Sequence, residues 1–180
     1  MLIGITGLAG SGKSEVARIL VDHYGFERVK FADPFKNMLR TMLRDIGHCE
    51  SDVERYLEGD LKETIVDGIG VTARRLMVTL GTEWGRRLIG DDLWIRLWAE
   101  RAACFPFTLA DDVRFANEVE TIEARGGIVW RVNRPGVGIA DHPSEWDIPN
   151  LSVTRTIHNV GSLGELHEQV HWLAANAGLA

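Results

Sequence analysis

Hydrophobic residues form short runs at several places along the chain, and turn residues bound each run. The clearest runs are "MLIGIT" at 1–6, "PFTLADDV" at 106–113 and "GIVWRVNR" at 127–134. Short apolar runs of this kind are typical of buried parallel strands. A plausible second strand is "FERVKFA" at 26–32, before the break at Asp33-Pro34, and a weaker fifth strand is "VTRTIHN" at 153–159. The pattern therefore predicts five strands.

Stripes of hydrophobic residues at helical spacing separate these runs. A helix is predicted from Lys13 to a C-terminal Gly25. The helix after the third strand is expected to have Asn117 as its N-cap, with Glu120 three residues on. A last helix should begin at the capping box formed by residues 162–165. Its inward-facing positions are Leu166, Val170 and Leu173.

The segment 35–103 shows helical patterns and no convincing strand. Three stretches, "PFKNMLRTML", "ARRLMVTL" and "DDLWIRLWAERA", have helical spacing, and the polar loop "EGDLKETIVDGIG" lies among them. Trp94 and Trp98 are four residues apart, so we expect both in a core. The order of strands and helices predicts a three-layer α/β/α fold over 1–180, with a parallel five-stranded sheet and a helical insertion.

A long segment without periodicity covers 134–152. It contains three prolines and two glycines and reads "RPGVGIADHPSEWDIPNLS". Such a loop is longer than a simple connection requires, so we expect it to be functional and to act as a lid.

Composition limits the classes of protein that need to be considered. With 180 residues, 45% of them hydrophobic, the chain fits one domain with a sizeable core. A formal charge of -6 argues against broad binding of nucleic acid. Cys49 and Cys104 lack metal-site spacing and suggest free thiols. No signal peptide precedes the first strand and no apolar run is long enough to cross a membrane, so a cytoplasmic protein is expected.

The first strand leads into the sequence "GLAGSGKS" at 7–14, which has the spacing of a phosphate-binding loop (P-loop). Its glycines let backbone N–H groups turn toward a phosphate. Lys13 would reach the β- and γ-phosphates of ATP, and Ser14 would ligate Mg²⁺. The predicted cofactor-binding residues here are Gly7, Gly10, Ser11, Gly12, Lys13, Ser14 and Glu15.

Phosphate binding alone does not identify a kinase, because GTPases, ATPases and motors use similar loops. The chain lacks the N-K-x-D guanine signature of switch GTPases and is short for a motor. A helical insertion and a long loop suit an enzyme that closes over two small ligands.

Several further motifs together resemble one family. They are "LGTEWGRRLIGDDLWI" (80–95), "DDVRFANEVETIEARGGIVWRVNRPG" (111–136), "HPSEWDIP" (142–149) and "HNVGSLGEL" (158–166). In this order behind the P-loop, they resemble the deoxynucleoside monophosphate kinases of bacteriophages and some bacteria. The resemblance implies a P-loop kinase fold, with transfer of the ATP γ-phosphoryl group to a deoxynucleoside monophosphate. A phage-encoded enzyme would act in the host cytoplasm. The chain is compatible with a homodimer, but the sequence does not fix the oligomeric state.

The resemblance places the pattern D-V-R-F-x-N-E on residues 112–118. Asp112 would hold Mg²⁺ through water or orient the acceptor, with helix capping as the alternative. Arg114 would face the monophosphate, and Glu118 would lie on the substrate side. The third strand departs from the family pattern at Thr108 and in its doubled acid, which leaves open whether Asp111 or Asp112 serves the metal.

The remaining implied residues lie on the acceptor side, at the lid and near the adenine. On the acceptor side they are Asp33, Lys36, Trp84 and Arg86, with solvent exposure as the alternative for Lys36 and packing for Trp84. Arg131 and Arg134 flank the lid. We expect one of them to reach the transferring phosphoryl group, Arg134 as the catalytic residue and Arg131 as a substrate contact. Asn159 and Gly161 would lie beside the adenine.

Three other functions fit parts of the sequence. Residues 167–171 read "HEQVH", a zinc-protease signature, with His142 or His158 as a distant third ligand. Inward-facing Val170 and Leu173 instead favour a packed helix whose histidines face solvent. A kinase for another small acceptor, such as dephospho-coenzyme A, is the nearest alternative, and a non-catalytic nucleotide-binding module is the third.

Overall fold

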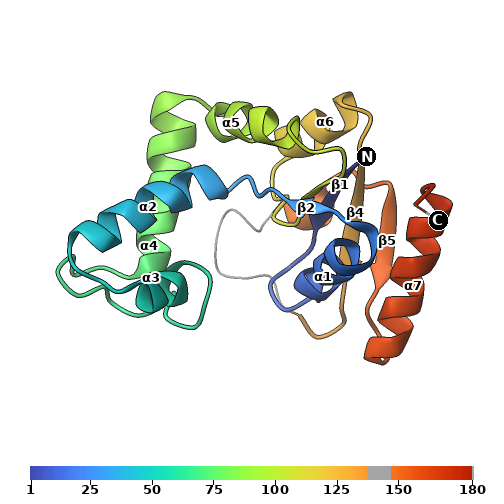
Figure 1. The fold of residues 1–180 in the computed structure, drawn as a ribbon, viewed down its shortest axis with the longest axis horizontal. Coiled ribbons are helices and arrows are strands. Elements are labelled where there is room, and N and C mark those ends of the chain that lie inside the picture. The colour runs from blue at the N-terminus through green and yellow to red at the C-terminus, as the bar shows by residue number, and fades with distance from the viewer. Residues whose placement is uncertain (138–146, 180) are drawn as a thin grey trace. The chain divides into compact units, whose positions relative to one another are not determined.

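The computed structural model describes residues 1–137 and 147–179, which form two compact units (Figure 1). The first unit consists of Met1–Lys30 and Arg101–Ala180, and the second is Phe31–Glu100. The bounds of the second unit differ by only a few residues from those of the predicted helical insertion, 35–103. Of the predicted lid, residues 138–146 lie outside the described residues.

The first unit contains a parallel sheet of five strands in the order β2-β3-β1-β4-β5. This confirms the predicted α/β fold class. The central strand β1 pairs with β3 on one side and β4 on the other, so chain connections leave the middle of the sheet in both directions. The strands are β1 Leu2–Thr6, β2 Glu27–Arg28, β3 Thr108–Ala110, β4 Ile128–Asn133 and β5 Arg155–His158.

Helices cover both faces of this sheet. Helices α1 (Lys13–Tyr24) and α7 (Leu163–Asn176) pack against each other on one face, and α6 (Ala116–Ala124) contacts β1 and β4 on the other. Leu166, Val170 and Leu173 of α7 are buried in the same core as β1, as predicted. The short helix η3 (Ile148–Asn150) lies near the C-terminal end of the predicted lid, 134–152, in its described part.

Several predicted boundaries in the first unit were wrong. The third strand covers Thr108–Ala110 instead of 106–113. The second strand pairs only over Glu27–Arg28, because it is the edge strand and the chain leaves the sheet before Phe31. Helix α6 begins one residue before Asn117, with Phe115 as its N-cap. The aromatic side chain of Phe115 cannot accept a hydrogen bond, and Glu118, rather than Glu120, reaches back to the backbone.

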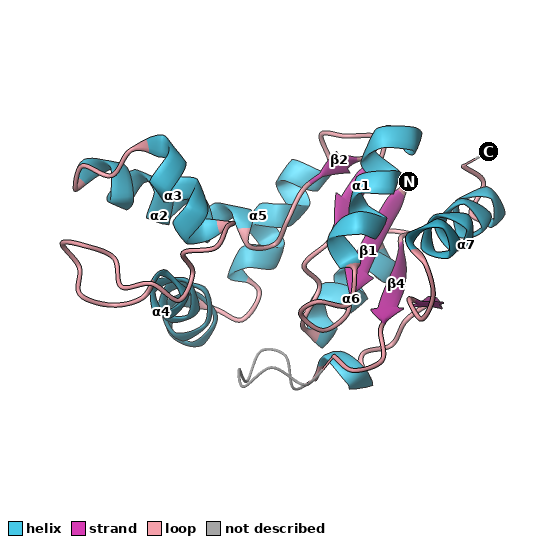
Figure 2. Ribbon diagram, turned by 90° about the horizontal axis from the view of Figure 1, so that it is seen from below, coloured by secondary structure: helices cyan, strands magenta, loops and turns pink. Residues whose placement is uncertain are grey.

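The second unit is helical, and all the strands drawn in Figure 2 belong to the first unit. Helix α3 was not predicted, although Val53, Tyr56 and Leu57 have helical spacing and are buried against α2 and α4. The helical segments are α2 Asp33–Asp45, α3 Glu50–Leu57, α4 Ala73–Val78, the π-helix η1 Thr79–Ile89 and α5 Leu93–Ala102, whose last two residues are assigned to the first unit.

The π-helix η1 is packed through its glycines. The indole Nε1 of Trp94 donates a hydrogen bond of 2.6 Å to the carbonyl of Gly81. A Cβ atom on Gly85 would collide with the same indole ring. Trp94 and Trp98 are 2% and 0% exposed, which confirms that both are core residues. Close approach of helix and ring therefore requires glycine at position 85.

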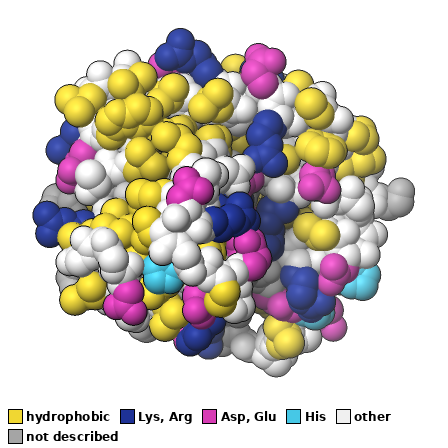
Figure 3. All heavy atoms as spheres, turned by 60° about the vertical axis from the view of Figure 1, so that its left-hand side comes forward, with side chains coloured by type: hydrophobic (Ala, Val, Ile, Leu, Met, Phe, Trp, Pro, Cys, Tyr) yellow, Lys and Arg dark blue, Asp and Glu magenta, His cyan; other side chains and the backbone are white. Residues whose placement is uncertain are grey.

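One face of the molecule is mixed in charge. On the face drawn in Figure 3, Lys and Arg side chains lie beside Asp and Glu side chains, with hydrophobic groups between them. Within the described residues, no helix has both the length and the apolar character that crossing a membrane requires.

Candidate active site

The P-loop connects β1 to α1 at the carboxyl edge of the central strand. In a parallel sheet, ligands bind at this edge where the connections diverge. Gly7 and Gly12 have φ angles of 145° and 106°, which side chains rarely allow. A Cβ on Gly7 would collide with the carbonyl of Val132, and one on Gly12 would lie 2.5 Å from the amide nitrogen of Asn159. The loop is thus packed tightly against β4 and the segment after β5.

Lys13 places its ammonium group over the loop. Its Nζ donates hydrogen bonds of 2.6 Å to the carbonyl of Gly7 and 2.7 Å to that of Leu8. The amino terminus of α1 adds a positive potential at the same place. A cation and a helix terminus at one loop form a site suited to a phosphate anion.

The two serines of the loop differ in exposure. Ser11 is 1% exposed, and its buried hydroxyl makes no hydrogen bond within the described residues. Ser14 is the second residue of α1 and is exposed, so its hydroxyl is accessible to a metal ion. A buried polar atom without a partner is costly, and a bound ligand would relieve that cost. The loop therefore fits the nucleotide that the sequence predicts.

Glu15 was expected to contact the cofactor, but in the structure its side chain contacts other residues of the chain. Its carboxylate accepts hydrogen bonds of 2.6 and 3.0 Å from Arg18 and lies 2.6 Å from Nε2 of His167. These contacts, with Arg18 the larger and His167 the smaller cause, lower the pKa of Glu15 to about 2. The carboxylate therefore joins α1 to α7.

Two acids follow β3, next to the P-loop. Asp111 is buried, and its Oδ2 lies 3.3 Å from Nε of Arg28 on β2, while its Oδ1 has no hydrogen-bond partner in the described chain. Asp112 is half-buried and directly precedes Val113, whose backbone N–H donates a hydrogen bond of 3.2 Å to the carbonyl of Ile5 near the end of β1. Asp112 is not the cap of α6, because that position belongs to Phe115.

Glu118 supports the backbone at Arg114. The carboxylate is 2% exposed and accepts hydrogen bonds of 2.7 Å from the backbone N–H of Arg114 and 3.2 Å from that of Phe115. It therefore caps α6 and holds this turn, which differs from the substrate contact expected from sequence. Arg114 is half-buried just beyond β3.

The two lid arginines also differ. Arg131 of β4 donates hydrogen bonds of 3.2 and 2.5 Å to the carbonyls of Ile148 and Leu151, and burial lowers its pKa. It thus anchors the described end of the lid segment to the sheet. Arg134 is exposed directly after β4. Of the two, Arg134 has the freedom to reach a ligand.

The residues after β5 contact the P-loop as well. The side-chain amide of Asn159 donates a hydrogen bond of 2.9 Å to the carbonyl of Ser11. Gly161 is exposed in the turn before α7. The structure thus brings the predicted residues of β1, β3, β4 and β5 to one edge of the sheet.

The other predicted residues belong to the second unit. Asp33 is the first residue of α2. The ammonium of Lys36 lies 2.8 Å from the Glu58 carboxylate. Trp84 is 37% exposed, and its ring lies 6.1 Å from that of Trp94. Arg86 is 7% exposed and donates a hydrogen bond of 2.8 Å to the backbone carbonyl of Asp91.

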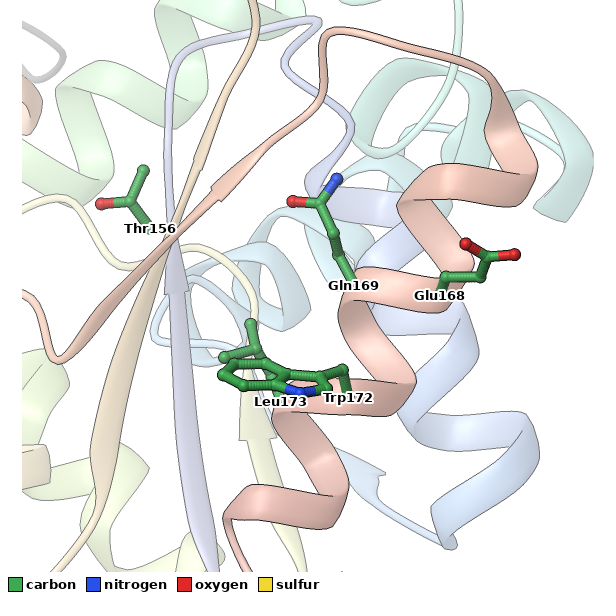
Figure 4. Close-up of a pocket in the computed structure, with 5 residues that line it drawn as sticks. All are labelled: Thr156, Glu168, Gln169, Trp172 and Leu173. Carbon is green, nitrogen blue, oxygen red and sulfur yellow. The ribbon is translucent and has the colours of Figure 1, made fainter.

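A cavity of about 440 Å³ lies between β5 and α7 (Figure 4). Gln169 and Trp172 project from α7 and Thr156 from β5. None of the predicted site residues lines this cavity, and its lining includes no cation to bind a phosphate. We therefore place the candidate site at the P-loop.

The histidines of "HEQVH" were expected to face solvent, but they are half-buried and contact α1. His167 reaches Glu15, and Nδ1 of His171 lies 2.8 Å from the hydroxyl of Tyr24. No group of three or more potential metal-ligating side chains occurs in the part of the chain that the structure describes. His142 lies outside that part.

Comparison with known proteins gives one informative relative and one informative structure. No protein-family model matches the chain. A protein of Acanthamoeba polyphaga mimivirus, named "Putative deoxynucleotide monophosphate kinase", is 30% identical over 98% of this chain and 97% of its own length. The crystal structure of TT1252 from Thermus thermophilus aligns with a TM-score of 0.52 at 22% identity, covering 100% of this chain and 98% of that one, and shares the fold. Identity to the viral protein over nearly the full length, together with the P-loop at the sheet edge, shows that the chain is a P-loop kinase of the deoxynucleotide monophosphate kinase family.

Proposed function

We propose that this kinase transfers the γ-phosphoryl group of ATP to a deoxynucleoside monophosphate, yielding the deoxynucleoside diphosphate. The observation that supports it best is the convergence of the P-loop with residues 111–118 at one edge of the sheet. The viral relative's name supports the deoxynucleotide acceptor.

The P-loop would bind the triphosphate. Lys13 can turn from the carbonyls of Gly7 and Leu8 to the β- and γ-phosphates, because its long side chain is already held over the loop. Ser14 and Asp112 would hold Mg²⁺, which neutralises charge on the phosphates. Asp112 is the more accessible of the two acids, because it is half-buried whereas Asp111 is buried beside Arg28.

Arg114 would bind the acceptor phosphate. Glu118 fixes the turn that carries Arg114, so the guanidinium starts from a defined backbone position. A guanidinium can form two parallel hydrogen bonds with phosphate. Arg134 would reach the transferring phosphoryl group. The acceptor contacts of Asp33, Lys36, Trp84 and Arg86 in the second unit remain predictions.

An acceptor panel tests the proposal. The protein is incubated with ATP, Mg²⁺ and ribo- or deoxyribonucleoside monophosphates, with dephospho-coenzyme A in parallel, and ADP formation is followed. We expect turnover chiefly with deoxynucleotides. An apolar wall near the 2′ position, for which Phe115 and Trp84 are candidates, would leave a ribose hydroxyl without a partner at about 1–3 kcal/mol, or roughly 5- to 150-fold.

The outcomes separate the alternatives. Preference for ribonucleotides, or turnover of dephospho-coenzyme A alone, would refute the deoxynucleotide assignment while leaving the kinase intact. Failure with every acceptor, despite ATP binding, would favour a non-catalytic nucleotide-binding module. Activity should also require Mg²⁺ and persist with 1,10-phenanthroline, which removes zinc.

A further inference from the structure

Asn159 links the far end of the chain to the P-loop. Its backbone N–H donates a hydrogen bond of 2.8 Å to the carbonyl of Asn133, which continues the β4–β5 ladder. Its side-chain amide donates one of 2.9 Å to the carbonyl of Ser11. The residue is thus fixed to the sheet by its backbone and to the loop by its side chain.

The hydrogen bond to Ser11 also determines the direction of the next N–H group. A peptide group is planar and trans, so the Ser11 carbonyl and the Gly12 N–H point in opposite directions. Holding the carbonyl toward Asn159 therefore turns the Gly12 N–H away from Asn159. A Cβ on Gly12 would lie 2.5 Å from the Asn159 amide nitrogen, so a glycine here allows the close approach.

We propose that Asn159 is a positioning residue that orients the Ser11–Gly12 peptide toward the phosphates of bound nucleotide. This inference rests on the proposed function, because it assumes that the P-loop binds ATP. It assigns the Asn159 side chain to the phosphate end of the nucleotide, in place of the adenine contact expected from sequence. Asn159 acts through the loop backbone and does not touch the reacting atoms.

The chain offers a matched control in Gln169. Its side chain makes two hydrogen bonds with the backbone of His158, at 3.2 and 3.0 Å, and so holds the same turn without contacting the P-loop. A merely structural role for the turn would make Gln169→Ala and Asn159→Ala equivalent. Asn159→Asp keeps the shape of the side chain, but it replaces the donor with a negative charge beside a carbonyl.

The experiment compares wild type with Asn159→Ala, Asn159→Asp, Gln169→Ala and Lys13→Ala. Titration calorimetry measures binding of Mg²⁺–ATP and of Mg²⁺–tripolyphosphate, and circular dichroism measures the melting temperature. We expect Asn159→Ala to weaken binding of both ligands by about 5- to 30-fold, and Asn159→Asp to weaken it further. Gln169→Ala should stay within about twofold of wild type, the variation expected when no ligand contact is lost. In steady state, the KM for ATP should rise while the KM for the acceptor stays unchanged.

Three results would overturn the inference. One is wild-type affinity in Asn159→Ala while Lys13→Ala loses binding. Another is a loss confined to ATP, with tripolyphosphate unaffected, which would return Asn159 to the adenine side. The third is an equal loss in Gln169→Ala. If Lys13→Ala bound both ligands normally, the proposed function itself would fail. If Asn159→Ala does not fold, the isosteric Asn159→Asp provides the same comparison.

Discussion

Nε2 of His167 lies 2.6 Å from Oε1 of Glu15, so α7 is hydrogen-bonded to the first turn of the helix that follows the P-loop. A second contact joins the same helices farther along, between His171 and the hydroxyl of Tyr24. The two histidines four residues apart, which a zinc site would also require, therefore serve the packing of α7 on α1.

The Glu15 contacts should make stability depend on acidity. The pKa of Glu15 is lowered from 4.5 to about 2, so these contacts stabilise the folded state above pH 4.5 and lose that effect as the pH falls toward 2. We expect the melting temperature of wild type to fall more steeply over this range than that of Glu15→Gln. The difference should be small, because water screens a carboxylate so near the surface.

Asp60 provides a control for this measurement. Arg55 lowers the pKa of Asp60 to about 2 as well, and the pair is exposed in the second unit. Asp60→Asn should make the melting temperature depend less steeply on pH over the same acid range, without altering the KM for ATP. Identical pH profiles for wild type and Glu15→Gln would show that the Glu15 contacts do not stabilise the fold.

Lys13→Ala should lower kcat by about 10²-fold or more, because no other side chain of the loop carries a positive charge to the phosphates. Lys13→Arg keeps the charge and controls for its loss. A coupled assay for ADP measures turnover, and circular dichroism confirms the fold. More than a tenth of wild-type activity in Lys13→Ala would contradict the assignment of the loop.

Glu118→Ala should lower the free energy of unfolding by about 1–3 kcal/mol, because two backbone N–H groups lose their acceptor. Glu120→Ala, on the exposed side of the same helix, should change it by less than about 0.5 kcal/mol. Urea denaturation measures both. Equal effects would mean that Glu118 does not cap α6.

The two lid arginines should separate stability from catalysis. Arg131→Met removes the donor to two backbone carbonyls and should cost about 2–4 kcal/mol in unfolding free energy. Arg134→Ala should leave stability within about 0.5 kcal/mol and lower kcat by about 10²-fold or more. Denaturation and single-turnover kinetics distinguish the two effects. If Arg131→Met were stable but catalytically impaired, Arg131 would be the catalytic arginine and its structural assignment would be wrong.

The sequence predicted those features that depend on local chemistry. Glycines at 7 and 12 mark the P-loop because the backbone there needs positive φ, and the five strands follow from short apolar runs. Helix α3 is only eight residues long and its buried side consists of Val53, Tyr56 and Leu57, so its hydrophobic period is too short to predict a helix. The cap of α6 was misplaced, because Asn117 is a common N-cap type and Phe115 is not.

Long-range contacts could not be predicted in this way. The hydrogen bond from Asn159 to Ser11 spans 148 positions of sequence, and that between His167 and Glu15 spans 152. No periodicity or motif relates such positions. The same holds for Arg131, whose partners are backbone carbonyls and therefore leave no trace in residue type.

The pairing of β1 with β3 has a consequence for synthesis of the chain. Leu2 pairs with Thr108, so the central strand of the sheet lacks its first neighbour until more than half of the chain has been made. The helices of the second unit contact one another over short stretches of sequence, and local contacts form quickly. The second unit can thus fold on the ribosome before β1 has a strand to pair with. The nucleotide-binding unit is completed last.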